Sequence, residues 1–294
     1  MICFFVNPAS GGGNGTRVWK KVERAIRNRE SWSVVFTEKP GSIKEHLESG
    51  AFSDITAAIA VGGDGTIHEL ANAIKGRDIH LGVIPAGSGN DFARALGISN
   101  DPVKAAENIF LGRTIRLDLG SLDERLFLTA VGSGFDGEVA RVTNKAAYKK
   151  WLNRINAGRL AYLIGVVQVL IRYRSCKVRM EINDEKFELD NVWLIAAANL
   201  KYYGGGLPIC PTADGEDGKL SICAIHGVSK LKALTILPRV VTGSHTGLKG
   251  VAMLEGQSCK ITSDSPLPIQ YDGEYAGKMN AVIRNIPSAI TVII

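Results

Sequence analysis

The sequence predicts an α/β protein with two domains: a mostly parallel N-terminal α/β domain and a C-terminal antiparallel β-sandwich domain with helical insertions. Strand and helix patterns alternate up to about residue 112, and three of the strands run into glycine-rich loops that open helices. After about residue 113, strand-like runs follow one another with short polar turns between several of them. We therefore expect domains over residues 1–118 and 119–294.

The first domain is expected to contain four strands, near residues 2–6, 32–37, 55–61 and 80–84, each followed by a helix. The helix after the third strand is predicted from Thr66 to about Lys75, because its apolar residues recur at helical spacing and Gly76 follows. These elements form a parallel sheet that helices cover on both faces.

Two further helices have recognisable ends. Ser42 and Glu45 predict a capping box for the helix after the second strand, and Gly50 predicts its end. Asp101 followed by Pro102 predicts the start of a helix that runs to about Leu111.

The second domain is predicted mainly as strands. They are expected at Ile115–Gly120, Leu126–Val131, Lys177–Ile182, Lys186–Leu189, Val192–Ala198, Leu220–Ile225, Cys259–Thr262, Ile269–Tyr271, Met279–Arg284 and Ala289–Ile294. Two helical stretches interrupt them, near 140–172 and 229–243. Antiparallel strands joined by short turns are typical of a β-sandwich.

The motif Gly62-Gly63-Asp64-Gly65-Thr66 predicts a phosphate-binding turn. It follows a buried strand and opens a helix, so backbone N–H groups and the positive end of the helix dipole point at one place. Glycines allow an anion to approach the backbone closely. A carboxylate at such a place would repel a phosphate, so Asp64 predicts a divalent metal that bridges it to a nucleotide.

Two more loops support this interpretation. The first strand runs into Asn7-Pro8-Ala9-Ser10-Gly11, and the fourth runs into Gly87-Ser88-Gly89-Asn90-Asp91. In an open α/β sheet, ligands bind at the carboxyl ends of the strands, so the three loops are expected to converge on one nucleotide. Asn90-Asp91 is also compatible with a simple helix N-cap. Neither a dinucleotide-binding G-x-G-x-x-G nor a P-loop G-x-x-x-x-G-K-[ST] is present.

Composition narrows the class of protein. The 5 cysteines are scattered and form no C-x-x-C pair, which disfavours a disulfide scaffold and a zinc site. The longest apolar stretch, residues 160–171, is too short to span a bilayer, and no signal peptide is expected. We therefore expect a cytoplasmic protein.

The net charge of +6 is concentrated in one stretch. Residues 141–179 contain many Lys and Arg residues and no Asp or Glu, with Trp151, Leu152, Ile155, Leu160 and Tyr162 between the charges. A solvated helix face is the simplest explanation, whereas no nucleic-acid-binding pattern is present. The mixture of cations and apolar residues also suits peripheral docking to an anionic membrane surface through Lys149, Lys150 and Arg154.

The three loop motifs together resemble the catalytic domain of the diacylglycerol kinase family, and the match is closest to the soluble bacterial lipid kinases. The resemblance continues through Gly204-Gly205-Gly206, Pro211, Asp217-Gly218 and Asp272-Gly273-Glu274, so it spans nearly the whole chain. It implies a lipid substrate, ATP and Mg²⁺. It implies that Asn7, Pro8, Ala9, Ser10, Gly11, Thr37, Gly62, Gly63, Asp64, Gly65, Thr66, Gly87, Ser88 and Asn90 line the ATP site. The family's Gly-His pair after Thr37 is replaced here by Gly41-Ser42.

The resemblance also implies roles for several carboxylates. Glu274 corresponds to the family's general base and Asp272 accompanies it, although the same residues read alone suggest a β-hairpin turn. Asp64 and Asp91 are implied in placing Mg²⁺ or substrate. Asp217, with the carbonyls of Asp214 and Lys219, is implied as a structural metal site. The family's helical return to the first domain is expected to be shortened or absent, with only the extreme C-terminus returning.

The predicted function is an ATP-dependent lipid kinase that converts diacylglycerol to phosphatidic acid. A sphingoid base or another lipid is an alternative acceptor, and NAD kinase is a second enzyme reading because it shares the Gly-Gly-Asp-Gly-Thr turn. A non-catalytic lipid- or nucleotide-binding regulator is the alternative from a different class. The sequence leaves the oligomeric state open, a homodimer included.

Overall fold

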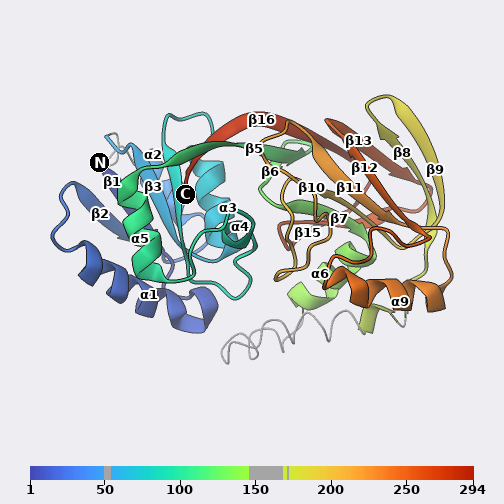
Figure 1. Cartoon of the computed structure of the whole chain (residues 1–294), viewed down its shortest axis with the longest axis horizontal. Helices are drawn as coiled ribbons and strands as arrows, with labels where there is room; N and C mark the ends of the chain where they lie inside the picture. The colour runs from blue at the N-terminus through green and yellow to red at the C-terminus, as the bar shows by residue number, and fades with distance from the viewer. Residues whose placement is uncertain (50–53, 146–167, 171) are drawn as a thin grey trace. The chain divides into compact units, whose positions relative to one another are not determined.

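The computed structural model describes residues 1–49, 54–145, 168–170 and 172–294 (Figure 1). These residues form two compact units. Unit 1 contains residues 1–117 and 288–294, and unit 2 contains the described residues between 118 and 287. Within the described residues, no helix has both the length and the apolarity that crossing a membrane requires.

Unit 1 is built on a parallel sheet with the strand order β2-β1-β3-β4. Its strands are β1 (Ile2–Val6), β2 (Trp32–Phe36), β3 (Ala57–Gly62) and β4 (His80–Pro85). The end of β16 (Ala281–Ile293) adds a parallel strand beside β4, with Val292 opposite Leu81. All four predicted strands are present.

The helices of unit 1 bury apolar faces against this sheet (Figure 1). They are α1 (Ser10–Ile26), α2 (Ser42–Glu48), α3 (Asp64–Ile74), α4 (Asp91–Ala95) and α5 (Pro102–Leu111). Val22 of α1 and Ala106 of α5 pack in one core with Phe4 and Ile59. Asp101 caps α5 as predicted, since its carboxylate accepts from two first-turn N–H groups.

Two predicted helix ends differ in the structure. The helix after β3 begins at Asp64, two residues before the expected start, because Gly63 is extended and already serves as its N-cap. The capping box at Ser42 is wrong: the Ser42 hydroxyl bonds to Lys39, and Glu69 of α3 accepts from the N–H groups of Gly41 and Ile43 at 3.0 Å. Gly50, the predicted helix end, lies outside the described residues.

Unit 2 contains two antiparallel sheets. One has the order β12-β11-β10-β7-β14-β15, and the other includes β16-β13-β8-β9, with β5 and β6 paired to each other. The bounds are β5 (Thr114–Leu122), β6 (Arg125–Phe127), β7 (Ala130–Gly134), β8 (Cys176–Ile182), β9 (Glu185–Val192), β10 (Leu194–Ala198), β11 (Leu220–Ile225), β12 (Val251–Gly256), β13 (Ser258–Ser263), β14 (Leu267–Tyr271) and β15 (Glu274–Met279). Helices α6 (Phe135–Lys145) and α9 (Lys230–Val240) accompany them.

The core of unit 2 lies between its two sheets. Val178 and Ile261 from one sheet pack with Ile195, Ile222 and Ile269 from the other, and all five are almost fully buried. Facing apolar layers of this kind define a β-sandwich. The predicted fold class, a parallel α/β domain plus an antiparallel β-sandwich domain, is confirmed.

Several strand predictions in unit 2 are corrected. The run expected at Leu126–Val131 is two strands, β6 and β7. Strand β12 was not expected, and β15 shares only Met279 with an expected strand. The last two expected strands are one continuous strand, β16, which passes from unit 2 into unit 1 at residues 287–288. The chain therefore returns to unit 1 as a strand. The first helical stretch begins earlier than expected, at Phe135, and residues 146–167 and 171 lie outside the described residues.

Candidate functional site

The loop after β1 is tied to the turn after β3 by side-chain hydrogen bonds. Asn7 Nδ2 donates to Thr66 Oγ1 at 3.0 Å, and Asn7 Oδ1 accepts from the Ala9 N–H at 3.1 Å across Pro8. The Gly63 N–H donates to Ser10 Oγ at 3.3 Å. Residues more than fifty positions apart are thereby held in one cluster at the carboxyl end of the sheet.

The loop after β4 joins this cluster by close backbone contact. A Cβ on Gly87 would lie 2.5 Å from the Gly63 Cα, and a Cβ on Gly11 would lie 2.4 Å from the Ala86 carbonyl oxygen. Contacts this short exclude any side chain, so both positions need glycine. The three predicted glycine loops therefore meet, as their spacing along the parallel strands indicated.

Asp64 and Asp91 lie at this meeting point. Asp64 is the first residue of α3, and its Oδ1 accepts from the Phe92 N–H of α4 at 3.1 Å. Asp91 is only 6% exposed and forms an ion pair with Arg94 at 3.1 Å. Both carboxylates are thus held at defined places beside the turn that the sequence predicts to bind phosphate.

Asn90 has a local role in shaping its loop. It adopts the left-handed conformation, with φ +54°, and its side chain does not cap α4. Its Oδ1 instead accepts from the Gly87 N–H at 2.9 Å, and its Nδ2 donates to the Gly87 carbonyl at 3.1 Å. Asn90 therefore closes the loop that brings Gly87 to Gly63.

Four further residues that the sequence predicts for this site are Thr37, Gly62, Gly65 and Ser88. Thr37 follows β2 and donates both its N–H, at 2.8 Å, and its hydroxyl, at 3.3 Å, to the Val6 carbonyl. Gly62 packs on Thr66, because a Cβ there would lie 2.5 Å from Thr66 Oγ1. Gly65 has open space around its Cα, and Ser88 is exposed.

The hairpin of β14 and β15 carries the two predicted carboxylates of unit 2. Asp272 stands in its turn with φ +46°, and its carboxylate accepts from Leu128 N and Thr129 N at 2.8 Å and from Thr129 Oγ1 at 2.6 Å. Asp272 therefore fixes the turn to the connection between β6 and β7. Glu274, the first residue of β15, is exposed.

A buried pair behind the hairpin was not found by sequence reasoning. Gln270 Nε2 donates to Asp136 Oδ2 at 2.6 Å, and Gln270 Oε1 accepts from the Gly273 N–H at 2.8 Å. Asp136 and Gln270 are only 3% and 2% exposed. In the sequence, Asp136 and Gln270 are visible only as polar residues within apolar segments. That pattern does not predict that the two side chains contact each other.

The predicted structural metal loop is closed by hydrogen bonds of the protein itself. Asp217 Oδ1 accepts from Lys219 N at 2.9 Å, Asp214 Oδ1 accepts from Glu216 N at 3.1 Å, and the Lys219 carbonyl accepts from Asn285 Nδ2 at 3.2 Å. The described part of the chain contains no group of three or more His, Cys, Asp or Glu side chains that could hold a metal. The predicted site uses one carboxylate and two backbone carbonyls, so the metal role of Asp217, Asp214 and Lys219 stays a prediction, and no step is assigned to a metal in this loop.

Asp64 and Asp91 suit a metal ion that is bound partly by protein carboxylates and partly by the phosphates of a nucleotide. Mg²⁺ in kinases is usually bound by one or two carboxylates together with substrate phosphates. The hard oxygen donors of Asp64 and Asp91, beside a phosphate-binding turn, are of that kind. These two residues would hold the ion.

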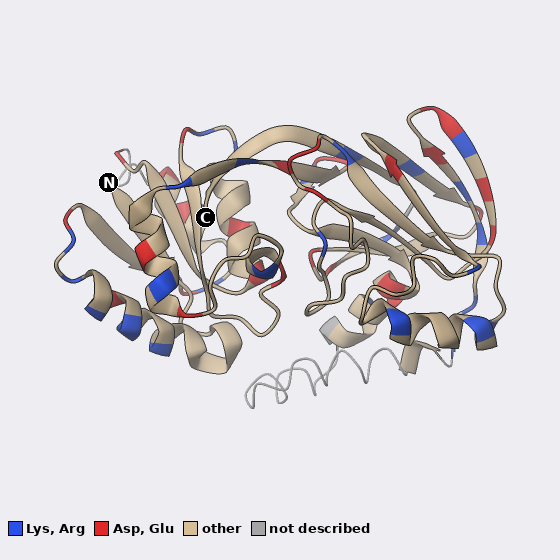
Figure 2. Ribbon diagram, viewed as in Figure 1, with Lys and Arg blue, Asp and Glu red and all other residues tan. Residues whose placement is uncertain are grey.

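Part of the basic stretch can be located. Lys149, Lys150 and Arg154, with the apolar residues between 151 and 162, lie outside the described residues. Lys177 is paired to Glu188 at 2.8 Å, and Arg179 is paired to Asp264 at 2.7 Å. Figure 2 shows that basic residues also occur along α1 and on α9, so positive charge is not confined to this stretch.

Two family models match the chain and together cover most of it. Residues 1–122 match the diacylglycerol kinase catalytic domain, and residues 129–294 match the YegS C-terminal NAD kinase beta sandwich-like domain. The second match alone covers more than half of the chain.

Individual proteins agree with the family models. A diacylglycerol kinase from Mycobacterium tuberculosis is 31% identical over 99% of this chain and 94% of its own length. Solved Bacillus anthracis structures, one of them described as a diacylglycerol kinase, cover 99% of this chain and 96% of their own, with 19% to 21% identity and TM-scores from 0.74 to 0.82. An Archaeoglobus fulgidus NAD kinase in complex with ATP shares the fold at 14% identity, with 100% and 94% coverage and a TM-score of 0.55.

Proposed function

The chain belongs to the diacylglycerol kinase family, and from that premise we propose that it transfers the γ-phosphate of Mg–ATP to the hydroxyl of diacylglycerol, which yields phosphatidic acid. The observation that carries the proposal is the convergence of three glycine loops beside Asp64 in unit 1. A site that can hold a triphosphate through backbone N–H groups is what phosphoryl transfer needs first.

In this proposal, unit 1 binds the nucleotide. The N-terminal end of α3 and the loops at Asn7–Gly11 and Gly87–Asn90 surround the phosphates, and Thr37 borders them. Asp64 and Asp91 hold Mg²⁺, which offsets the charge of the phosphates when it is bound. The hydrogen bond from the Phe92 N–H keeps the Asp64 carboxylate in a fixed orientation.

In this proposal, unit 2 supplies the general base and binds the lipid that accepts the phosphate. The Glu274 carboxylate takes the proton of the lipid hydroxyl as that oxygen forms its bond to the γ-phosphorus and the bond from phosphorus to the departing ADP oxygen breaks. Asp272 has a different role here, because its carboxylate already accepts hydrogen bonds from Leu128 and Thr129. Asp272 is a positioning residue that sets the start of β15.

The other partners follow from a lipid acceptor. A membrane-bound acceptor needs an enzyme that docks peripherally to the membrane surface, and the cations of residues 141–179 supply attraction to anionic lipids. Sphingoid bases and NAD are the competing acceptors, and NAD is supported by the shared Gly-Gly-Asp-Gly-Thr turn and by the fold shared with the Archaeoglobus fulgidus NAD kinase. A non-catalytic regulator would not need Glu274 as a base.

The test is phosphate transfer by Glu274→Gln. We expect kcat to fall by about 100-fold or more, the usual size of a general-base contribution, with ATP affinity unchanged in calorimetry. The matched control is Glu185→Gln, because Glu185 is also an exposed glutamate that begins the second strand of a hairpin in unit 2. Equal turnover in wild type and Glu274→Gln, or the same loss in Glu185→Gln, would remove Glu274 as the base.

The acceptor is tested in the same assay with radiolabelled ATP. Diacylglycerol, a sphingoid base and NAD are offered separately to the wild-type protein. Label is expected in phosphatidic acid. Label in NADP alone would indicate that the protein is an NAD kinase. Label in none of the three products would favour a non-catalytic regulator.

A further inference from the structure

Helix α9 covers the outer face of one of the two sheets of unit 2. Its buried side chains, Ala233, Ile236 and Val240, pack with Leu194 of β10 and Ile225 of β11. The core between the two sheets is a separate cluster, so α9 lies on the side of its sheet that faces away from the other sheet. In Figure 1, α9 runs along the outside of unit 2. The candidate site takes no residue from this helix.

The outward side of α9 combines apolar and basic side chains. Leu231, Thr235 and Arg239 recur at intervals of four residues, which places them on one side of the helix, and all three are exposed. Lys232 is also exposed, and it lies on the same side because seven residues, or about two turns, separate it from Arg239. Leu231 is 77% exposed, more than any other large apolar side chain of the described residues, and Val241 after the helix is 61% exposed.

The charge of this surface is not offset by acids from its own part of the chain. Residues 218–254 contain 5 Lys and Arg residues and no Asp or Glu. Among the described residues, neither Lys232 nor Arg239 takes part in an ion pair. In Figure 2, α9 carries blue positions and no red ones. The surface is therefore positively charged and complementary to a negatively charged partner.

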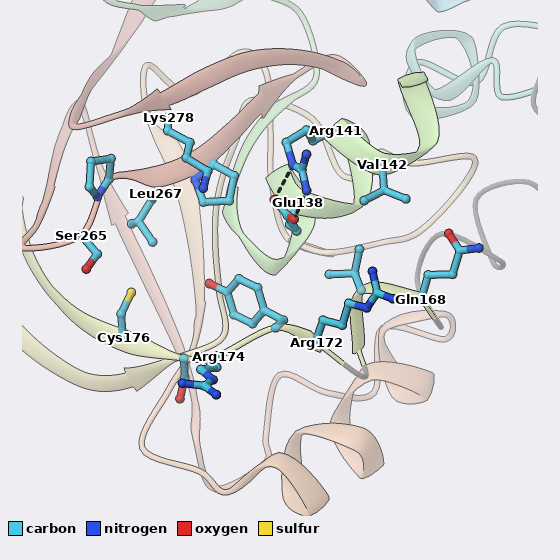
Figure 3. Close-up of a pocket in the computed structure, with 15 residues that line it drawn as sticks. Glu138, Arg141, Val142, Gln168, Arg172, Arg174, Cys176, Ser265, Leu267 and Lys278 are labelled. Carbon is cyan, nitrogen blue, oxygen red and sulfur yellow. Dashed lines mark hydrogen bonds and ion pairs between the residues drawn. The ribbon is translucent and has the colours of Figure 1, made fainter. Parts of the chain in front are cut away.

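The inner side of α9 reaches the wall of a pocket. Leu237 packs against the apolar cluster of Phe135, Val139 and Val169. Val169 also lines a pocket of about 770 Å³ (Figure 3), a volume typical of sites for organic ligands. Helix α9 thus lies between this pocket wall and the outer surface of unit 2.

We propose that the outer face of α9 docks unit 2 to an anionic membrane surface. Leu231 and Val241 enter the boundary between headgroups and acyl chains, while Lys232 and Arg239 stay at the level of the lipid phosphates. The exposed apolar side chains favour a membrane over a purely ionic partner, because only an apolar environment removes them from water. This surface lies outside the basic stretch 141–179, so it is a second docking element. Its purpose, access to a lipid acceptor, rests on the proposed function, but the binding does not.

The test is flotation of the full-length protein with vesicles in the absence of nucleotide. The wild type is expected to bind vesicles that mix phosphatidylglycerol with phosphatidylcholine. The combined change Lys232→Gln and Arg239→Gln should weaken this binding at least about tenfold, because each cation near an anionic surface contributes a factor of about five. Leu231→Ser should weaken it about threefold or more, since a buried leucine side chain is lost from the contact.

The matched control is Lys186→Gln with Lys260→Gln. These two lysines are exposed on β9 and β13, which belong to the other sheet of unit 2, and their replacement removes the same charge. The control variant should bind the vesicles as the wild type does. A rise in ionic strength should weaken binding of the wild type more than binding of the α9 double variant, because salt screens exposed charges.

Several outcomes would overturn the proposal. Unchanged binding in Lys232→Gln with Arg239→Gln, the same loss in the control, or equal binding to vesicles of pure phosphatidylcholine would each do so. Lack of binding to any vesicle would also overturn it and would leave an acidic protein as the partner of this surface. None of these measurements involves phosphate transfer, so their failure is distinguishable from a failure of the kinase assignment, which Glu274→Gln tests.

Discussion

Two carboxylates in one turn of unit 2 have different surroundings and hence different chemistry. Asp272 accepts from three donors of residues 128–129, and a carboxylate with that many short bonds is committed to holding the chain. Glu274, two residues later, is exposed at the start of a strand and can meet a substrate. Sequence proximity thus does not imply a shared role.

This difference predicts that substitutions at the two positions have unequal effects on stability. Asp272→Asn replaces one acceptor oxygen by an NH₂ group that faces N–H donors, so we expect the free energy of unfolding to fall by about 2–3 kcal/mol. Glu274→Gln should change it by less than about 0.5 kcal/mol, as is usual for an exposed position. Urea denaturation measures both. A stable Asp272→Asn protein would contradict the positioning role.

At the scale of the elements, a glycine on β7, Gly132, allows helix α6 to contact the hairpin of β14 and β15. A Cβ on Gly132 would lie 1.8 Å from Asp136 Oδ2 and 2.7 Å from Gln270 Nε2. Gly132 therefore leaves room for the Asp136 carboxylate of α6 to accept a hydrogen bond from Gln270 of β14. The Gln270 side chain in turn accepts a hydrogen bond from the Gly273 N–H. Helix α6 sets the geometry of the β14–β15 turn without contributing a group that reacts.

The corresponding prediction is that Gly132→Ala destabilises the protein by about 1–3 kcal/mol, the usual cost of overpacking. Thermal denaturation is the measurement. Gly247→Ala is the control, because its Cα has open space around it and the backbone there does not require glycine. Similar melting temperatures for the two variants would show that the Asp136–Gln270 pair can shift without cost.

At the level of the whole chain, the two units share strands. The boundaries between the units fall inside β5, after Leu117, and inside β16, after Pro287. The last seven residues complete unit 1: Val292 is fully buried opposite Leu81, and the Ile294 N–H donates to the Arg113 carbonyl at 2.9 Å. Unit 1 therefore cannot assemble completely until the end of the chain is present.

Val292→Ala tests this dependence. Removing two buried methyl groups is expected to lower the free energy of unfolding by about 1–3 kcal/mol in urea denaturation. Val241→Ala makes the same chemical change at a residue that is 61% exposed, and it should stay within about 0.5 kcal/mol of wild type. If the two variants lose stability equally, the C-terminal strand adds nothing to unit 1.

From the printed sequence one can predict the parallel sheet of unit 1, its three glycine loops and their meeting point. Such features depend on near neighbours in sequence: an apolar strand, glycines that the backbone requires, and a helix that follows. The fold class of unit 2 is predictable for the same reason, because alternating apolar runs and short turns are local patterns.

Tertiary contacts decide the rest. Asp272 bonds to residues more than 140 positions away, Gln270 meets Asp136 across 134 positions, and Glu69 replaces Ser42 as the cap of α2. No local pattern encodes these partners, because a polar side chain that becomes buried takes whichever donor or acceptor the packed elements bring to it.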